Sequence, residues 1–508
     1  MIRLTVAQIA DIVGGELVDI SAQAATDLHV TGTVEFDSRK VTPGGLFLAL
    51  PGARSDGHDH AGSAVAAGAV AVLAARPVGV PAIIVSPAAP PATQRGQGGL
   101  AGVLEHDNDG SGAAVLAALA KLAAAVAAEL VASGLTIVGI TGSSGKTSTK
   151  DLLAAVLEPL GEVVAPPGSF NNELGHPWTV LRATADTDYL ILELSARHLG
   201  NIAELAAIAP PAIGVVLNVG TAHLGEFGSR EAIAKTKSEL PQAVPRSGVV
   251  VLNADDPAIA AMAEVTAARV VRVSRHQHTD LWAGPVTLDE LARPRFALHA
   301  GDAVVDVTLA VHGDHQVGNA LCAAAVAVEC GAGLEQVAAA LAGAGPVSGH
   351  RMRVSTRADG VTVIDDAYNA NPDSMRAGLQ ALAWISAGSG VGPDGKHRRS
   401  WAVLGEMAEL GDDAISEHDR IGRLAVRLDV SRLIVVGTGR SMSAMHHGAV
   451  MEGSWGGEAA LVADADAALA LLRAELQPGD VVLVKASNAA GLGALADSLT
   501  TDGQGNTR

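Results

Sequence analysis

One segment, TIVGITGSSGKTSTKDLL at positions 136–153, constrains the fold of this chain more than any other. The run from Thr136 to Ile140 has the character of a buried strand, and the residues from Lys146 onward have that of a helix. Between them, Gly142 and Gly145 let backbone N–H groups turn toward an anion without a side-chain clash. The positive end of the helix dipole adds to this attraction, so the segment predicts a phosphate-binding loop in an α/β domain.

The two residues that open the helix complete the chemistry of a nucleotide site. Lys146 can neutralise the β- and γ-phosphates of ATP, and the hydroxyl of Thr147 can bind Mg²⁺. The general phosphate-loop pattern has a glycine six residues before the lysine, where this chain has Ile140, so the loop is a shorter form. A glycine-rich turn with a lysine there by chance is the alternative, and the flanking strand and helix argue against it. The residues expected to bind ATP are Gly142, Ser143, Ser144, Gly145, Lys146, Thr147 and Ser148.

Length and composition favour several domains with cores of small aliphatic side chains. The chain has 508 residues, which is too long for one ordinary domain. Apolar residues make up 48% of it and aromatic residues only 2%, a composition that suits helices packed closely on parallel sheets. The formal net charge of −19 disfavours nucleic-acid partners, and an anionic small substrate would need a local group of basic residues.

Several features bear on the location of the protein in the cell. The N-terminus, MIRLTVAQIADIVGG, has neither the long apolar core nor the cleavage site of a secretory signal. Lys121 and Glu129 interrupt the alanine-rich stretch 113–132, which favours a helix within a globular protein over a membrane span. Cys322 and Cys330 lie in an apolar stretch and are expected to be reduced core residues. We therefore expect a cytoplasmic monomer without a membrane span.

Three regions can be distinguished along the chain, at 1–110, 111–345 and 346–508. Each alternates strand-like apolar runs with helical patterns, the βαβ rhythm of a parallel sheet. Polar, glycine-rich stretches at 92–112 and 387–400 are expected to be loops. The strand candidates are 46–50, 70–73, 82–85, 135–140, 189–194, 213–218, 249–253, 361–364, 401–404, 433–436 and 481–484. The expected fold is α/β with three domains, and the middle one has a parallel sheet that carries the phosphate loop.

Polar residues that follow the strands of the middle region are candidate metal ligands. Glu193 ends one strand and His223 follows the next, and ligands bind at the carboxyl ends of parallel strands. Taken singly, Glu193 could be a surface carboxylate and His223 a structural histidine. Lys235 and Lys237 lie on a helical stretch, where lysines are usually solvated. Only the convergence of several such groups beside the phosphate loop favours a metal site.

The chain resembles the Mur ligases, ATP-dependent enzymes that form amide bonds in peptidoglycan precursor synthesis, over almost its whole length. The segments that carry the resemblance follow the family's order and are GSSGKTS, NVGTAHLGEFGS, AKTKSEL, NADDP, GDHQVGNALCAAAVA and DDAYNANPDSM. The first region contains DSRKVTPGGLFLALPGARSDGHDH, which is similar to the UDP-binding part of two family members. FNNELGHP and LGEMAELG resemble the member that adds a dipeptide, and the DNPR-type motif of the diaminopimelate-adding relative is absent from the sequence.

This resemblance implies a UDP-sugar-binding α/β domain at 1–110, a central P-loop ATPase domain at 111–345, and a Rossmann-like domain at 346–508 for the incoming dipeptide. It implies that ATP and Mg²⁺ serve to join UDP-MurNAc-tripeptide to D-alanyl-D-alanine through an acyl phosphate. The last domain is expected to close over the middle one and bring Arg351 to the ATP. Folylpolyglutamate synthase, a rival with the same core, lacks the UDP-binding region, and a regulatory ATP-binding protein would need fewer metal ligands.

The resemblance also implies roles for individual residues. Lys146 would be catalytic and bind ATP, Thr147 would bind the first Mg²⁺, and Glu193 and His223 would be catalytic metal ligands. Lys237 matches a lysine that is carbamylated in relatives, which would turn a cation into a catalytic, Mg²⁺-binding anion. The other implied contacts are Asn319 to adenine, Arg351 to ATP, Asp366 to ribose, Ser38 and Arg39 to the uridine diphosphate, and Asn171 and Asn172 to the sugar-peptide. The positions that depart from the family pattern are Ser195, Arg197, Gln316, Ala486 and Asn488.

Overall fold

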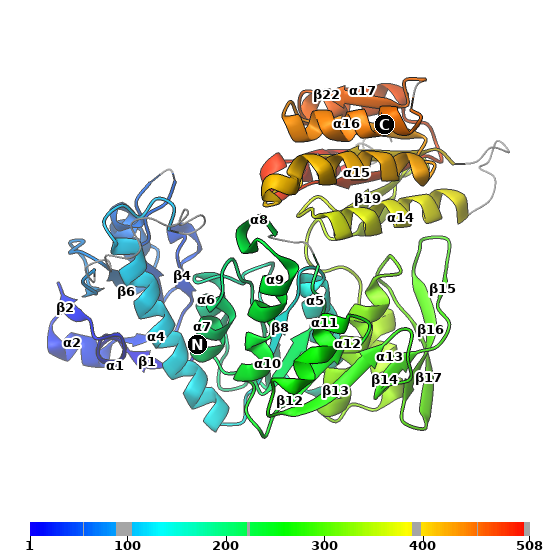
Figure 1. Ribbon diagram of the computed structural model, residues 1–508. Coiled ribbons are helices and arrows are strands. Elements are labelled where there is room, and N and C mark those ends of the chain that lie inside the picture. The colour runs from blue at the N-terminus through cyan, green and yellow to red at the C-terminus, as the bar shows by residue number, and fades with distance from the viewer. Residues whose placement is uncertain (54, 88–103, 221–223, 389–397, 455, 502–508) are drawn as a thin grey trace.

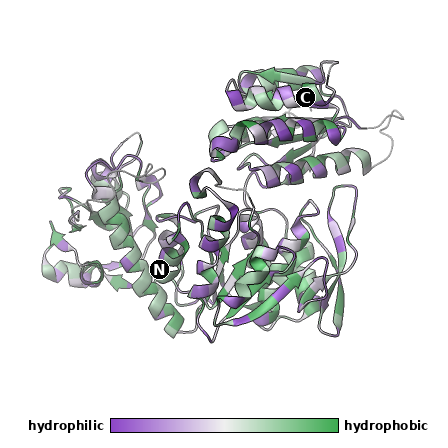
Figure 2. Ribbon diagram, viewed as in Figure 1, coloured by the Kyte–Doolittle hydropathy of each residue, from purple (hydrophilic) through white to green (hydrophobic). Residues whose placement is uncertain are grey.

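The structure, a computed structural model, describes residues 1–53, 55–87, 104–220, 224–388, 398–454 and 456–501. These residues form three α/β parts in chain order, each built around its own large sheet, and Figure 1 shows them from blue through green to red. Hydrophobic strands lie inside each part, and helices of mixed hydropathy surround them (Figure 2). The prediction of an α/β fold with three domains is confirmed.

The first part contains a five-stranded sheet in the order β2-β7-β6-β5-β4, parallel except between β2 and β7, and a small antiparallel pair, β1-β3. Its first helix begins with a capping box, in which the Thr5 hydroxyl accepts from the N–H of Gln8 and the Gln8 side chain accepts from the N–H of Thr5. The elements are β1 (Leu4–Thr5), α1 (Val6–Val13), β2 (Glu16–Val18), α2 (Ala22–Asp27), β3 (His29–Val30), β4 (Val34–Glu35), η1 (Ser38–Lys40), β5 (Gly45–Leu48), η2 (Gly57–His60), α3 (Ala61–Ala66), β6 (Ala69–Ala74) and β7 (Ala82–Ile84).

A long helix, α4 (Ser111–Ala132), connects the first part to the second. It packs against α1 of the first part and against α6 and α7 of the second, and Leu119 and Leu122 are buried in a core that both parts share. Within the part of the chain that the structure describes, α4 is the one helix long and apolar enough to cross a membrane, by length and composition. Half of its most apolar window is buried inside the protein.

The second part is built on a ten-stranded sheet in the order β15-β16-β14-β13-β12-β11-β8-β10-β9, with β17 paired to β16. Neighbouring strands from β9 to β14 are parallel, and helices α5, α12 and α13 cover one face of this sheet. The elements are β8 (Thr136–Thr141), α5 (Lys146–Leu157), η3 (Glu158–Leu160), β9 (Val163–Val164), α6 (Gly175–Val180), β10 (Tyr189–Glu193), α7 (Asn201–Ile208), β11 (Ile213–Val216), α8 (Leu224–Phe227), α9 (Arg230–Lys237), α10 (Glu239–Ala243), β12 (Val249–Asn253), α11 (Pro257–Ala260), η4 (Ala261–Glu264), β13 (Arg269–Ser274), β14 (Leu281–Ala283), β15 (Thr287–Leu288), β16 (Pro294–Ala300), β17 (Ala303–Thr308), α12 (Gln316–Glu329) and α13 (Leu334–Gly343).

One end of this sheet differs from the parallel sheet that was predicted. β16 runs antiparallel to β14, β15 and β17, so the central sheet is mixed. On β16, buried Phe296 and Leu298 alternate with the more exposed Arg295 and His299, as in antiparallel sheets with one face toward solvent. These strands lack the continuous apolar runs that marked most of the parallel strands, and they were not predicted.

The third part has a six-stranded sheet in the order β18-β19-β23-β20-β21-β22, in which only the edge strand β18 is antiparallel to its neighbour. It lies against the second part, and the indole N–H of Trp384 on α14 donates to the backbone carbonyl of Asp289 at 2.8 Å. The elements are β18 (Arg353–Thr356), β19 (Thr362–Asp365), α14 (Pro372–Gly388), β20 (Ser400–Leu404), η5 (Gly411–Asp413), α15 (Ala414–Arg427), β21 (Arg432–Val436), α16 (Arg440–Glu452), β22 (Ala459–Val462), α17 (Ala465–Glu475), β23 (Val481–Lys485), η6 (Asn488–Ala490) and α18 (Gly493–Thr501).

Each predicted strand has a counterpart in the structure, with ends that differ by at most two residues. The three large sheets span 16–84, 136–308 and 353–485, so each lies within one predicted region. The boundaries at 110 and 345 themselves stay predictions. Of the predicted loops 92–112 and 387–400, residues 92–103 and 389–397 lie outside the described residues.

Helix α6 contains a histidine that should make stability depend on pH. His176 is 1% exposed, and burial lowers its pKa to about 4, although backbone groups of Glu193 and Leu205 act in the opposite direction. In the unfolded chain the ring takes up a proton near pH 6.5, so the unfolded state binds more protons as the pH falls from about 6.5 to about 4. The stability that comes from the neutral ring is therefore complete above pH 6.5 and is lost below it, by about 2 kcal/mol at pH 5.

Urea unfolding at pH 7 and pH 5 would test this expectation. The difference in the free energy of unfolding between the two pH values should shrink by about 2 kcal/mol in His176→Gln. The matched control is His198→Gln, because His198 is an exposed histidine of the same part of the chain. An unchanged pH dependence in His176→Gln would contradict the expectation.

Candidate active site

The phosphate loop lies at the centre of the middle sheet. β8 is flanked by β10 and β11, and its carboxyl end leads into the loop, after which α5 begins at Lys146. Gly145 caps α5 at a φ of 82°, and a Cβ atom there would lie 2.7 Å from Oδ1 of Asn319 on α12. Both the left-handed backbone and the close approach require glycine at this position. The predicted order of strand, loop and helix is confirmed.

Asn218, which was not among the predicted site residues, holds the loop in shape. Asn218 follows β11, and its amide exchanges two hydrogen bonds with the backbone of Ser144: the Ser144 N–H donates to Oδ1 at 3.0 Å, and Nδ2 donates to the Ser144 carbonyl at 3.1 Å. The N–H of Gly220 donates to the hydroxyl of Ser143 at 2.9 Å. The loop is thus fixed from the neighbouring strand, and a side-chain amide directly after a buried strand was the available signal in the sequence.

The ammonium group of Lys146 lies within the loop. Its Nζ donates to the backbone carbonyl of Gly142 at 2.7 Å. Burial lowers the pKa of Lys146, the carboxylate of Glu193 acts in the opposite direction, and the Arg351 guanidinium lowers it further. A partly buried cation whose charged form is disfavoured gains from an anionic partner. The loop therefore offers a phosphate group a lysine, backbone N–H groups and the start of α5.

A fully buried carboxylate stands beside the loop, at the end of the next strand. Glu193 ends β10, and its Oε2 accepts from the hydroxyl of Thr147 at 3.2 Å, from Nδ2 of Asn171 at 3.3 Å and from the hydroxyl of Ser169 at 3.4 Å. Its Oε1 has no hydrogen-bond partner among the described residues. A buried oxygen without a donor, next to a hydroxyl and a phosphate loop, fits a hard cation such as Mg²⁺.

Lys237, another predicted metal ligand, lies close enough to Lys146 for the two charges to interact. It is buried at the end of α9, whereas Lys235, two residues earlier on the same helix, is exposed. Burial lowers the pKa of Lys237 well below its usual value, and the charge of Lys146 lowers it further. Its ammonium group makes no hydrogen bond or ion pair with the described residues. The predicted ligand His223 lies outside the described residues, so its position stays a prediction.

Two predicted nucleotide-binding residues come from the third part. Nη2 of Arg351 donates to the hydroxyl of Thr147 at 3.3 Å, and its guanidinium lies 4.2 Å from the centre of the Tyr368 ring. Arg351 thus reaches the phosphate loop in this structure. Asp366 forms a buried ion pair with Lys485 at 2.6 Å and accepts from the N–H of Met352 at 3.1 Å. Its ribose contact stays a prediction.

The predicted substrate residues do not form one cluster. Arg39 is exposed and paired with Asp37, and this guanidinium holds the pKa of the Asp37 carboxyl at about 2. Ser38 lies beside them in η1, in the first part. Asn171 belongs to the group around Glu193, whereas Oδ1 of Asn172 accepts from the N–H of Gly175 at the start of α6.

Comparisons with known proteins agree with this geometry. The Mur ligase family catalytic domain matches residues 31–123, the Mur ligase middle domain matches 140–327, and the Mur ligase glutamate ligase domain matches 350–488. The UDP-N-acetylmuramoyl-tripeptide–D-alanyl-D-alanine ligase of Mycobacterium tuberculosis (strain ATCC 25618 / H37Rv) is 78% identical over 513 aligned positions, which cover 99% of this chain and 98% of that protein. The chain belongs to the Mur ligase family.

More distant Mur ligases give the same assignment. The Escherichia coli (strain K12) ligase of that name is 34% identical over 86% of both chains. A crystal structure of MurF from Acinetobacter baumannii superimposes with a TM-score of 0.79 at 27% identity and covers 98% of this chain and 99% of the other. MurF from Thermotoga maritima in complex with ADP gives 0.72 at 26% identity and covers 94% and 98%. The MurF-type architecture therefore extends over the whole chain.

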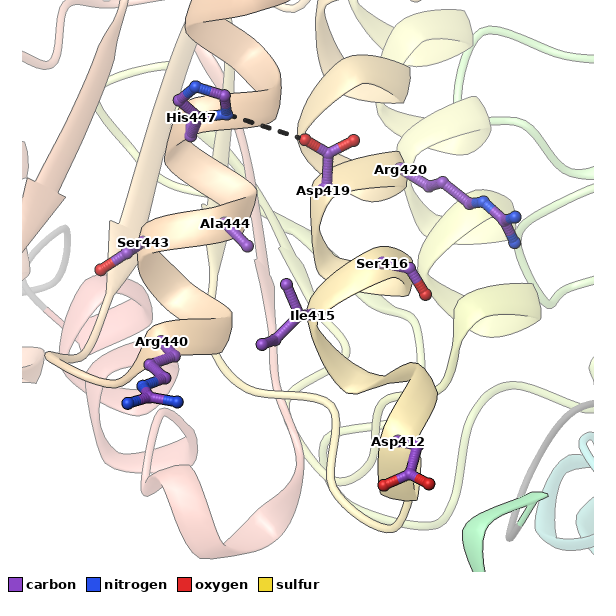
Figure 3. Close-up of a pocket in the computed structure, with 9 residues that line it drawn as sticks. All are labelled: Asp412, Ile415, Ser416, Asp419, Arg420, Arg440, Ser443, Ala444 and His447. Carbon is purple, nitrogen blue, oxygen red and sulfur yellow. Dashed lines mark ion pairs between the residues drawn. The ribbon is translucent and has the colours of Figure 1, made fainter. Parts of the chain in front are cut away.

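One open surface pocket of this Mur ligase lies apart from the phosphate loop. A pocket of about 740 Å³ lies between α15 and α16 of the last domain, and Figure 3 shows Arg420, Arg440 and His447 around it together with Asp412 and Asp419. None of its lining residues comes from the phosphate loop or the Glu193 group. The candidate active site is instead the place where strand ends of the middle domain meet the first residues of the last domain.

Proposed function

We propose that this Mur ligase joins D-alanyl-D-alanine to UDP-MurNAc-tripeptide and uses ATP to do so. The observation that carries the proposal is the 78% identity, over almost the whole chain, to a ligase whose name states these substrates. The phosphate loop and the buried carboxylate beside it supply the groups that such a reaction needs, and the ADP complex of MurF from Thermotoga maritima supports the nucleotide. We further propose that the protein acts in the cytoplasm as a monomer.

The chemistry follows from the reactivity of carboxylates. A carboxylate does not react with an amine at neutral pH, because the oxygen that must leave is a poor leaving group. In the proposed reaction a carboxylate oxygen of the tripeptide attacks the γ-phosphorus of ATP, ADP leaves, and an acyl phosphate results. The amine of the dipeptide then attacks the acyl carbon and loses a proton, the C–O bond to the phosphoryl group breaks, and amide and phosphate are released.

The residues of this chain position the reactants and offset their charge. Lys146 and the loop N–H groups bind the β- and γ-phosphates, and Arg351 approaches them from the last domain. Mg²⁺, held by Thr147 and Glu193 and by His223 and a carbamylated Lys237, would offset phosphate charge. Because burial lowers the pKa of Lys237, its neutral amine is available to react with CO₂. Asn319 beside Gly145 is the proposed adenine contact.

An assay of ADP release with each substrate omitted in turn would test the proposed function. We expect ADP release to need UDP-MurNAc-tripeptide and, for sustained turnover, D-alanyl-D-alanine. Folates with glutamate serve as the control for folylpolyglutamate synthase activity and should release no ADP. Sustained ADP release without the dipeptide would refute the substrate assignment. ADP release with folate and glutamate would favour folylpolyglutamate synthase activity.

A further inference from the structure

The connector between the middle and last domains, residues 346–352, is anchored on α5, the helix that follows the phosphate loop. Ser348, which is buried, donates from its backbone N–H to Oδ2 of Asp151 at 3.0 Å and from its hydroxyl to Oδ1 of the same carboxylate at 3.1 Å. The ammonium group of Lys150 donates to the Ser348 hydroxyl at 3.1 Å. One serine thus binds two successive residues of α5.

The charges in this anchor are compensated within it. Lys150 pairs with Asp151 at 2.8 Å and also donates to the carbonyl of Pro166 at 2.8 Å. The side chain of Lys150 is 3% exposed and that of Asp151 is 9% exposed. Hydrogen bonds to charged groups that are shielded from water are stronger than those at the surface. The anchor is therefore a rigid attachment, unlike a surface ion pair.

The connector follows one face of α5 toward the phosphate loop. Thr147 and Asp151 are four residues apart on the helix, so their side chains lie on the same face, one turn from each other. Ser348 binds Asp151, and Arg351 reaches back to Thr147. Residues 348–351 of the connector therefore run alongside one turn of α5. At the end of this stretch, the Arg351 guanidinium lies at the Thr147 hydroxyl.

The backbone just after the anchor adopts an uncommon conformation. His350 has a φ of 55° and Met352 a φ of 49°, in the left-handed region that residues other than glycine disfavour. Arg351 lies between them. Such a conformation persists only where its surroundings hold it, here through the Ser348 anchor on one side and the bond from the Met352 N–H to Asp366 on the other.

We infer that Ser348, Asp151 and Lys150 are positioning residues for the ligase reaction, because they fix the connector on the phosphate-loop helix and so hold Arg351 at Thr147. This inference rests on the proposed function, which assigns Arg351 to ATP. It adds that Arg351 is placed by the helix that carries the phosphate-binding lysine and not only by closure of the last domain. Without the anchor, Arg351 would occupy its position for only part of the time.

Variants of Ser348 test this inference directly. Ser348→Ala removes the hydroxyl that binds both α5 residues, and kcat for ADP release should fall about fivefold to tenfold. Ser348→Thr keeps a hydroxyl and should restore most of the activity. The matched control is Ser386→Ala, because Ser386 is a buried serine of α14 that donates to the carbonyl of Ala383, and it should leave kcat unchanged. Wild-type kcat in a folded Ser348→Ala would overturn the inference.

A double-mutant cycle with Arg351→Ala separates positioning from a merely structural role. If Ser348 acts through Arg351, Ser348→Ala should change kcat by less than twofold once Arg351 is alanine. An equal loss in both backgrounds would overturn the inference, because the serine would then act independently of Arg351.

Hydrogen exchange of the connector amides, 346–352, provides a readout that needs no substrate. Exchange should be faster in Asp151→Asn and in Ser348→Ala than in the wild type, and unchanged rates in both would overturn the inference. A wild-type protein that releases no ADP would instead count against the proposed function, while the exchange experiment would still test the anchor.

Discussion

Lys146→Ala is expected to reduce ADP release with UDP-MurNAc-tripeptide and D-alanyl-D-alanine by about 10³-fold or more. The Nζ of Lys146 lies at the carbonyl of Gly142, inside the loop that is proposed to bind the β- and γ-phosphates. Arg351 and the loop N–H groups remain in the variant, but they cannot replace the lysine cation on the transferred phosphoryl group. Initial rates at saturating ATP would measure the effect.

The control for this variant is an exposed lysine of the same domain. Lys235→Ala removes a charge from the surface of α9 and should retain the wild-type rate. The thermal unfolding midpoint of Lys146→Ala should stay close to that of the wild type, because the substitution removes a partly buried cation whose charged form is disfavoured. Full activity of Lys146→Ala would refute the assignment of the loop as an ATP site.

Lys237→Ala should have the second-largest effect, a loss of about 10²-fold or more in kcat. A carbamate on Lys237 would be an anion buried near the phosphate loop, and alanine removes it. A short carboxylic acid such as formate or acetate could then enter the space and return part of the activity. Chemical rescue by carboxylates, measured as ADP release against carboxylate concentration, is the distinguishing result.

Lys235→Ala is the matched control here as well, because both lysines lie on α9 and only Lys237 is buried. We expect neither loss of activity nor rescue in the control. Mass spectrometry of the wild type at neutral pH, with and without added bicarbonate, should detect a mass increase of one CO₂, the group that carbamylation adds. If Lys237→Ala were fully active, or if amines rescued it as well as carboxylates, the carbamate role would be refuted.

Much of the fold was predictable because parallel strands are buried on both faces. Their sequences read as continuous apolar runs, for example 213–218 and 481–484, and such runs are visible without knowledge of neighbours. The antiparallel strands at 287–308 carry polar residues on one face and were missed for that reason.

The candidate site was predictable only in part. Glu193 was recognised from its place at a strand end, and the structure puts its Oε2 3.2 Å from the Thr147 hydroxyl. Asn218 and Ser348 were not recognised, because a lone amide or serine has many uses, whether it follows a buried strand or lies in a loop. Arg39 was predicted to contact an anionic substrate, and its pairing with Asp37 depends on the local turn of η1.

The sequence by itself determined the phosphate loop of this protein, since a strand, a glycine-rich turn and a helix are adjacent along the chain and their chemistry is local. Only the tertiary structure decided which distant groups surround that loop. Glu193, Lys237 and Arg351 converge there because β8 lies between β10 and β11 and because the connector lies along α5. Strand order and domain docking depend on packing between segments far apart in the sequence, and no local pattern encodes them.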